Sequence, residues 1–583
     1  MNISLKLSRS QHFITVCVFA GVACGLIGVG FHLAIAEVFG GLWSTYSGLG
    51  ALVWPAMILT PAVAGLIVGL LLQFIEPGAV GSGIPQVKAA YHTQDGSIPG
   101  RQAFWRFIAG VISVGGGNSL GREGPTVHIC SASCSQLGRL FRLDKERIRA
   151  MVPVGMAAGI SAAFNAPIAA IMFVIEELLD DFSSAALGGI LIAVVIAAVV
   201  ERTLLGEEGA LMTRSVEFAT EPWMLVCLVL GPVAGLLGHL FVTSLLKARA
   251  RARTLTMPAW VRPAAGGLSV GLIGTLVFAL SDGHHGVFSI GYADLTSALA
   301  GELGLLALAL LLIGKMIATV LCYASGASGG IFAPVLFIGA MLGGVFGVVE
   351  VELLKLSPDV AAAVALLGTG AFFAAVIRCP ITSILIIFEM TRNYSLILPL
   401  MAGNLIAYAI AVRLRPIPVY DALLLQDGVN LRDLPQYQGK RNWKHIPVSA
   451  IMSAAPLSLS SSFSAERALG AIAEAGVSHR SYPVIDPESH RVDGLISHHE
   501  LETLAANEVD KPLLNIVVGR KLVMLRPELR VDKAIAELLA QDVPRAPVVS
   551  DDGDCRLLGM ITINDIVRQQ NMTRDKETGE FNV

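Results

Sequence analysis

Two stretches of the chain decide the fold, because they repeat one pattern. Residues 155–176 read GMAAGISAAFNAPIAAIMFVIE, and residues 368–389 read GTGAFFAAVIRCPITSILIIFE, so Gly, Pro and Glu recur without a gap at an offset of 213 residues. Upstream, GREGP at 121–125 matches GIFAP at 330–334 at an offset of 209. Two motif pairs in the same order indicate an internal duplication. Two repeats whose helices are interrupted by Gly and Pro are typical of membrane transporters.

Composition separates a membrane part from a soluble part. The chain has 583 residues, of which 54% are hydrophobic and 15% are charged. Charged residues make up about 11% of residues 1–412 and about 25% of the remainder, and the second share is usual for soluble domains. Residues 38–75, 151–175, 316–349 and 393–412 hold no Asp, Glu, Lys or Arg and are long enough to cross a bilayer. A net charge of −3 excludes a nucleic-acid binder that relies on bulk basicity.

Three glycine-rich segments interrupt the apolar pattern, and each precedes a predicted helix. They are GSGIP at 81–85, GREGP at 121–125 and GGIFAP at 329–334. The Pro in each suits a first helical turn, where its missing N–H is not needed. A helix N-terminus carries unpaired N–H groups and about half a positive charge. Several such ends directed at one place inside a membrane would bind an anion, whereas the alternative is that the segments are simple helix kinks.

Glu123 lies in one of these segments, and an ionisable residue inside a membrane is a functional candidate. When ionised, its carboxylate would itself occupy the anion position at the helix start. When protonated, it would leave that position. One side chain would thereby link anion passage to proton binding. The alternative is that Glu123 forms a structural ion pair with Arg122.

The three segments resemble the signature motifs of the CLC family of chloride channels and proton-coupled chloride transporters. The likeness covers roughly residues 10–425. It implies an all-α membrane domain with an inverted repeat and broken helices, in a homodimer with one pore per subunit. By motif, Glu123 would be the gating glutamate and external proton acceptor. The chloride-binding positions that the resemblance implies are Ser82, Gly124, Ile331, Phe332 and Tyr420. Without the resemblance, Tyr420 would be interpreted as an interfacial aromatic residue.

Glu177 bears on whether the protein exchanges ions or is a passive channel. Exchangers of the family carry an internal proton-transfer glutamate at the end of the helix after an Asn-Ala-Pro segment, which stands here at 165–167. Glu176 has a repeat partner in Glu389, which suggests a shared structural role, whereas Glu177 is matched by Met390. We therefore expect Cl⁻/H⁺ antiport with Glu177 as the internal proton-transfer residue. The alternatives are a voltage- or pH-gated chloride channel and a merely solvated carboxylate at a helix end.

Two residues after GSGIP depart from common family patterns. Gln86 stands where many relatives have an acid, and Lys88 stands where some bacterial exchangers have another. We expect Lys88 to pair with Glu177 and to favour its ionised form, which would alter proton delivery rather than selectivity. Ser82 matches the chloride-type pattern of the family, in which nitrate-preferring members have Pro. Chloride is therefore the expected substrate.

From about residue 445 the pattern changes to short strands and amphipathic helices, and it repeats. SYPVI at 481–485 and GLISHHE at 494–500 are echoed by RAPVV at 545–549 and GMITIND at 559–565. The unit resembles a tandem CBS pair, an α/β module that often binds adenine nucleotides. By that resemblance, Thr562 and Asp565 would contact the phosphate and ribose of ATP, ADP or AMP. A purely structural or dimer-stabilising tail is the alternative.

These patterns predict four parts: a transport domain over 1–425, a linker over 426–444, and CBS repeats over 445–505 and 506–583. No GxxxxGK[ST] or HExxH motif occurs, and the eight cysteines show no metal-ligand spacing. We therefore expect no enzyme, no metal site and no required cofactor. A CBS-regulated transporter of another ion is the rival class, and it would need acids that the long spans lack.

Basic residues predict the orientation in the membrane. Lys6 and Arg9 precede the first span and Arg413 and Arg415 end the last one, which places both termini in the cytoplasm. The run KARARAR at 247–253 is assigned to a cytoplasmic loop. The expected location is a bacterial inner membrane, with several spans.

Overall fold

A computed structural model of the chain describes residues 8–179, 186–206, 226–355, 357, 359–431, 446–454, 456–476, 479–507, 511–551 and 553–568. Within these ranges, nine helical stretches are long and apolar enough to cross a membrane, with mean hydropathy from 1.8 to 2.5. The chain forms two compact units, Met1–Leu431 and Arg432–Val583. All nine stretches lie in the first unit, which is therefore the membrane part that the composition predicts.

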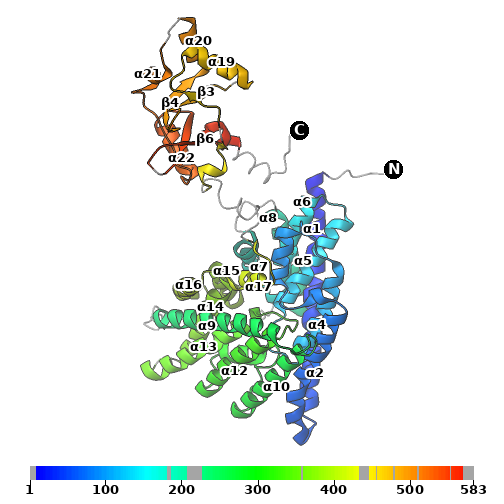
Figure 1. Cartoon of the computed structure of the whole chain (residues 1–583). Coiled ribbons are helices and arrows are strands. Elements are labelled where there is room, and N and C mark those ends of the chain that lie inside the picture. The colour runs from blue at the N-terminus through cyan, green and yellow to red at the C-terminus, as the bar shows by residue number, and fades with distance from the viewer. Residues whose placement is uncertain are drawn as a thin grey trace, which may run out of the picture. The chain divides into compact units, whose positions relative to one another are not determined.

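The first unit contains two successive sets of helices (Figure 1). The first set is α1 (Arg9–Tyr46), α2 (Val53–Phe74), α3 (Ile84–Thr93), α4 (Gly100–Gly115), α5 (Glu123–Leu140), α6 (Lys145–Phe164), α7 (Pro167–Val174) and α8 (Leu187–Leu205). The second set is α9 (Cys227–Thr254), α10 (Arg262–Leu280), α11 (Tyr292–Leu299), α12 (Leu305–Ala324), α13 (Phe332–Leu354), α14 (Asp359–Ile377), α15 (Pro380–Thr391), α16 (Ile397–Leu414) and α17 (Val419–Gln426). The two sets touch mainly through α2 and α10 and through α7 and α15, and α5 also meets α13.

The predicted duplication and the broken helices are confirmed. Helices α5, α6 and α7 recur as α13, α14 and α15, and the starts of α7 and α15 are the two prolines of the repeated stretch, Pro167 and Pro380. The uncharged stretch 316–349 does not form one helix, because α12 ends at Ala324 and α13 begins at Phe332. Each glycine-rich segment leads directly into a helix, α3, α5 or α13, and its Pro lies in the first turn.

Two glutamates join the repeats reciprocally. Glu176, in a π-helical turn after α7 (Ile175–Leu179), accepts hydrogen bonds from the backbone N–H groups of Ile381 (3.0 Å) and Thr382 (2.8 Å) at the start of α15. Glu389, near the end of α15, accepts from the N–H groups of Ile168 (3.0 Å) and Ala169 (2.7 Å) at the start of α7. Each helix end thus caps the beginning of its partner, so the two helices run antiparallel. Antiparallel equivalents are the mark of an inverted repeat, and the shared structural role predicted for Glu176 and Glu389 is confirmed.

The second unit contains two small sheets. One has the order β2 (Leu459–Ser460), β3 (Ser481–Ile485), β4 (Val492–Ser497), and the other the order β1 (Ser453–Ala454), β6 (Leu557–Thr562), β5 (Arg545–Val549). The accompanying helices are α19 (Ala465–Ala475), α20 (His498–Ala506), α21 (Leu513–Val517) and α22 (Val531–Ala540). The antiparallel pairs β3–β4 and β5–β6 are equivalent, since Pro483 opposes Leu495 and Pro547 opposes Met560. The predicted tandem α/β repeat is confirmed.

One assignment from the sequence is wrong, and one falls partly outside the structure. The basic run 247–253 is not a loop, because it forms the last turns of α9. Alternating Ala and Arg have good helix propensity, so the helix continues past its apolar part. Most of the predicted linker 426–444 lies outside the described residues, which resume at 446.

Candidate functional site

Backbone hydrogen bonds hold the three glycine-rich segments together in the first unit. The N–H of Gly121 donates to the carbonyl of Gly330 at 2.7 Å, and the N–H of Gly330 donates to the carbonyl of Gly121 at the same distance. Gly81 forms a β-bridge with Ser328, and the N–H of Gly329 donates to the carbonyl of Gly81 at 3.4 Å. Segments up to about 250 residues apart in sequence therefore meet at one place, where the helix starts of α3, α5 and α13 converge.

Glycine is required where these helix starts approach one another. A Cβ atom at Gly124 would lie 2.6 Å from both the carbonyl oxygen and the hydroxyl of Ser82, which is closer than real contacts allow. A Cβ at Gly330 would lie 3.0 Å from the amide nitrogen of Gly124. The small residues therefore bring the Ser82 hydroxyl and the N-terminus of α5 side by side, with no side chain between them.

The carboxylate of Glu123 lies at the N-terminus of α13. Glu123 is fully buried, and it accepts hydrogen bonds from the hydroxyl of Tyr292 at 3.0 Å and from the backbone N–H of Ala333 at 3.3 Å. The nearest guanidinium nitrogen of Arg122 is 4.0 Å away, and Arg122 instead donates to the carbonyl of Ala163 at 2.9 Å. The carboxylate is therefore held mainly by a helix N-terminus and a hydroxyl rather than by an ion pair. The carboxyl group thus lies at a helix start of the kind at which the sequence predicts an anion.

Two predicted chloride-binding hydroxyls are buried without partners. The hydroxyl oxygens of Ser82 and Tyr420 have no hydrogen-bond partner among the described residues, and the two residues are 1% and 0% exposed. Buried polar atoms nearly always have a hydrogen-bond partner in proteins, so these two hydroxyls are available to a bound ion. Tyr420 lies on α17, which packs against α3, the helix that follows Ser82. Ile331 and Phe332, at the start of α13, are also fully buried.

Glu177 forms the ion pair that the sequence predicts. Its Oε1 accepts a hydrogen bond from Nζ of Lys88 at 2.9 Å, and its side chain is only 4% exposed. The alternative of a solvated carboxylate at a helix end is therefore wrong, because α7 continues as a buried π-helical turn around this residue. Lys88 also contacts Asp421 at 2.7 Å, and no sequence pattern indicates Asp421 as a site residue. The thiol of Cys379 lies 3.8 Å from the other carboxylate oxygen of Glu177.

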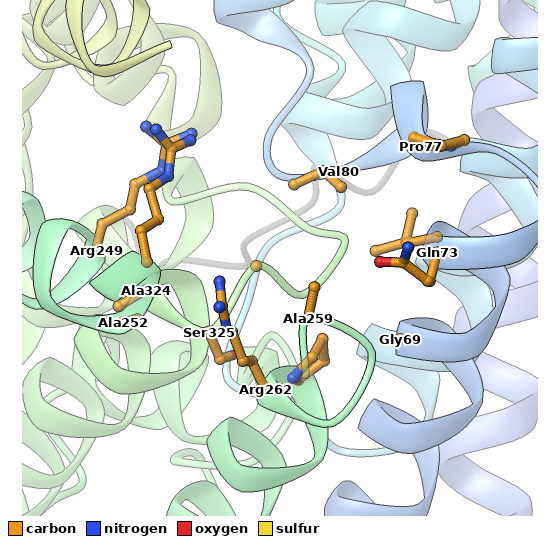
Figure 2. Close-up of a pocket in the computed structure, with 14 residues that line it drawn as sticks. Gly69, Gln73, Pro77, Val80, Arg249, Ala252, Ala259, Arg262, Ala324 and Ser325 are labelled. Atoms are coloured by element: carbon orange, nitrogen blue, oxygen red, sulfur yellow. The ribbon is translucent and has the colours of Figure 1, made fainter. Parts of the chain in front are cut away.

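A cavity of about 220 Å³ adjoins the glycine-rich segments (Figure 2). It is lined on one side by Val80 and Gly326, next to the bridge between Gly81 and Ser328. Three arginines line it as well: Arg249, Arg253 and Arg262. None of its lining residues is Asp or Glu, and one acid, Asp427, pairs with both Arg249 and Arg253, so the three arginines leave an excess of positive charge beside the site.

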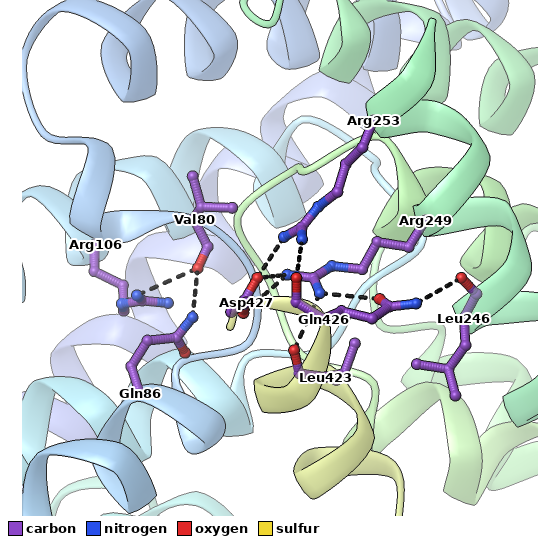
Figure 3. Close-up of polar contacts among 9 residues, drawn as sticks. All are labelled: Val80, Gln86, Arg106, Leu246, Arg249, Arg253, Leu423, Gln426 and Asp427. Atoms are coloured by element: carbon purple, nitrogen blue, oxygen red, sulfur yellow. Dashed lines mark hydrogen bonds and ion pairs between the residues drawn. The ribbon is translucent and has the colours of Figure 1, made fainter. Parts of the chain in front are cut away.

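Two of these arginines, Arg249 and Arg253, clamp the end of α17 to the end of α9 (Figure 3). Arg249 donates to both carboxylate oxygens of Asp427, at 2.9 and 3.1 Å, and Arg253 forms an ion pair with the same group. Gln426 donates to the carbonyl of Leu246 at 2.9 Å and thereby ties the two helices once more. The helix that carries Tyr420 is therefore anchored by its C-terminal end.

The predicted nucleotide contacts have a local role in the second unit. Thr562 and Asp565 form a reciprocal capping pair, because the Thr562 N–H donates to the carboxylate at 2.8 Å and the Asp565 N–H donates to the Thr562 hydroxyl at 3.1 Å. Ser497 and Glu500 form the same arrangement before α20. Capping explains the Ser/Thr–x–x–acid spacing in both repeats. It leaves nucleotide binding at Thr562 and Asp565 a prediction.

Comparisons with known proteins agree with this architecture. The sequence model of the family described as voltage gated chloride channel matches residues 64–412, and the CBS domain model matches 448–505 and 516–571. The "H(+)/Cl(-) exchange transporter ClcA" of Yersinia pestis bv. Antiqua is 33% identical, over 69% of this chain and 85% of its own.

Solved structures give the same result. A slow cyanobacterial Cl-/H+ antiporter superposes with a TM-score of 0.65 at 26% identity, over 72% of this chain and 98% of its own. A eukaryotic CLC transporter, at 19% identity, shows the same fold over 95% of this chain and 98% of its own, with a TM-score of 0.60. The chain therefore belongs to the voltage gated chloride channel (CLC) family and carries a C-terminal pair of CBS domains.

Proposed function

We propose that the protein exchanges chloride for protons across a membrane, through one pore in each subunit of a homodimer. The observation that carries the proposal is the buried Glu123 carboxylate bound to the N–H of Ala333, at the start of α13. There an ionised carboxylate and a chloride ion compete for the same donors. The names of the ClcA relative and of the cyanobacterial antiporter support exchange of these two ions.

Chloride is held by neutral donors in this scheme. The unpaired hydroxyls of Ser82 and Tyr420 would donate to it, together with backbone N–H groups around Gly124, Ile331 and Phe332. Such donors and helix N-termini attract an anion without a fixed cationic partner, so the ion can also leave. The cavity lined by arginines would raise the local chloride concentration on one side of this site.

Protons enter the scheme through Glu123 and Glu177. When Glu123 binds a proton it loses its charge, which frees the N–H of Ala333 for chloride. Glu177, ion-paired with Lys88, would supply or receive that proton from the other side of the membrane. Each proton that moves would then change whether chloride can occupy the α13 site, which couples the two ions. A passive channel would leave the buried Glu177 without a role.

A proton gradient should therefore drive chloride movement. Purified protein in liposomes is expected to accumulate chloride against its own gradient when the inside is made acidic, with the membrane potential clamped. Glu123→Ala is the control, because it removes the titratable group from the chloride site. With Glu123→Ala, chloride should only equilibrate across the membrane. The same result with the wild-type protein would show that it is a passive channel.

Membership of the family supports further proposals about the location and domain organisation of the protein. We propose a bacterial inner-membrane location with both termini in the cytoplasm, a transport domain over 1–425, a linker over 426–444 and CBS repeats over 445–505 and 506–583. We also propose that the protein has no enzymatic activity and that its CBS pair binds an adenine nucleotide. Titration calorimetry of the full chain tests this binding: heat with ATP, ADP or AMP that disappears in Thr562→Ala supports it, and no heat contradicts it.

A further inference from the structure

Asp421 is a second carboxylate beside the Lys88–Glu177 pair. Nζ of Lys88 lies 2.9 Å from Oε1 of Glu177 and 2.7 Å from Oδ1 of Asp421, so one ammonium group contacts both carboxylates. The side chain of Asp421 is 18% exposed, against 4% for Glu177 and 7% for Lys88. Asp421 is therefore the member of this cluster that water reaches most readily.

The two carboxylates differ in how Lys88 holds them. Lys88 donates a hydrogen bond to Glu177, whereas Oδ1 of Asp421 has no hydrogen-bond partner among the described residues. The Lys88–Asp421 contact is thus an ion pair without hydrogen-bond geometry. A carboxylate has two oxygens, so Asp421 can bind a proton on Oδ2 while Oδ1 keeps its contact with Lys88.

The charges of the cluster favour one shared proton. One ammonium faces two carboxylates, so the cluster carries one negative charge in excess when both are ionised. Neighbouring like charges oppose full ionisation, and such groups take up protons as a unit. Lys88 can stay with whichever carboxylate is ionised. The other titratable groups around the cluster are the thiol of Cys379, the hydroxyl of Tyr420, and the buried His92 one turn further along α3, while Arg249 of α9 is engaged by Asp427.

We propose that Asp421 takes up protons from water and passes them to Glu177, with Lys88 as the positioning residue that holds the two carboxylates together. The inference rests on the proposed exchange function and deepens it. In each transfer the Asp421 carboxylate binds a proton, gives it to the Glu177 carboxylate and returns to its ionised form. The competing explanation is that Asp421, in the first turn of α17, only balances the charge of Lys88.

The test uses the full chain in liposomes, with proton and chloride fluxes recorded together. Asp421→Asn is expected to lower proton flux at least about tenfold, because a positioned proton acceptor contributes about 100-fold or more to a transfer and water replaces it only in part. Asp421→Glu should restore the flux. Asp95→Asn is the matched control, since it removes an exposed acid just after α3, the helix of Lys88, and should leave the proton-to-chloride ratio unchanged.

A double variant separates proton uptake from charge balance. If Asp421 only neutralises Lys88, Lys88→Met together with Asp421→Asn will regain proton flux, and if Asp421 takes up protons the double variant will stay slow. In a Glu123→Ala background, Asp421→Asn should leave chloride flux unaltered, which excludes a folding defect. Unchanged proton flux in Asp421→Asn, or recovery in the double variant, overturns the proposal. Glu177→Gln separates failure of the Asp421 proposal from failure of the exchange mechanism. Proton flux that survives Glu177→Gln would refute the exchange mechanism itself.

Discussion

The reciprocal caps between α7 and α15 offer a quantitative test of the inverted repeat. Glu176 and Glu389 occupy equivalent places, and each accepts from two backbone N–H groups of the opposite helix. The sites differ in one respect. Thr382 adds a hydroxyl that donates to Glu176 at 2.6 Å, whereas its repeat equivalent is Ala169, which has no donor in its side chain. Glu176→Ala should therefore destabilise the protein more than Glu389→Ala.

The size of the difference follows from that single hydrogen bond. Thr382 and Ala169 are both fully buried, and Ile381 and Ile168 are 49% and 51% exposed, so the backbone contributions should nearly cancel. A hydrogen bond to a charged group contributes about 1.5–3 kcal/mol, and we expect Glu176→Ala to cost more than Glu389→Ala by about that amount.

Equilibrium unfolding of the detergent-solubilised protein measures both costs. The matched control is the same comparison in a Thr382→Ala background, which gives the two caps the same donors. There the costs of Glu176→Ala and Glu389→Ala should become equal. Equal costs in the wild-type background, or a difference that persists after Thr382→Ala, would refute the assignment of the two caps as structural equivalents.

Other variants test the site itself. Glu123→Ala should give chloride flux that no longer depends on pH, because the titratable competitor at α13 is gone; efflux that remains pH-dependent would contradict this. Glu177→Gln should stop proton flux while chloride still moves; acidification of the vesicle interior, driven by chloride efflux through this variant, would contradict the prediction. Gly124→Ala should abolish chloride flux, since the new Cβ would lie 2.6 Å from Ser82; Gly30→Ala, with no atom within 4 Å of its new Cβ, is the control. Arg262→Gln should slow chloride uptake most at low ionic strength, where screening is weak. A reduction in uptake that does not change with the concentration of an inert salt would contradict an electrostatic role for Arg262.

The sequence predicted those features that depend on short patterns. The repeat, the broken helices and the equivalence of Glu176 and Glu389 follow from spacing, because each helix start needs its glycines and Pro within a few residues. The Lys88–Glu177 pair could also be predicted, because Lys88 stands where some bacterial exchangers of the family have an acid. These predictions needed no knowledge of which helices touch.

What the sequence did not predict depends on contacts between distant segments. Tyr292 bonds to a carboxylate 169 residues away, and nothing in its neighbourhood distinguishes it from other aromatic residues at helix starts. Asp421 has no sequence signal because its partner Lys88, on α3, stands 333 residues earlier in the chain. The basic run 247–253 predicts a cytoplasmic loop, whereas it ends α9, and Arg249 and Arg253 bind Asp427 at the end of α17.

Thermodynamic coupling is the central claim, and uphill proton movement measures it most directly. Liposomes that contain the purified protein are loaded with chloride and diluted into low-chloride buffer, with the potential clamped and a small opposing proton gradient imposed. Chloride leaving down its gradient is expected to drive protons into the vesicles against theirs, and Glu123→Ala should abolish this movement. Chloride efflux with protons moving only down their own gradient would contradict the exchange mechanism.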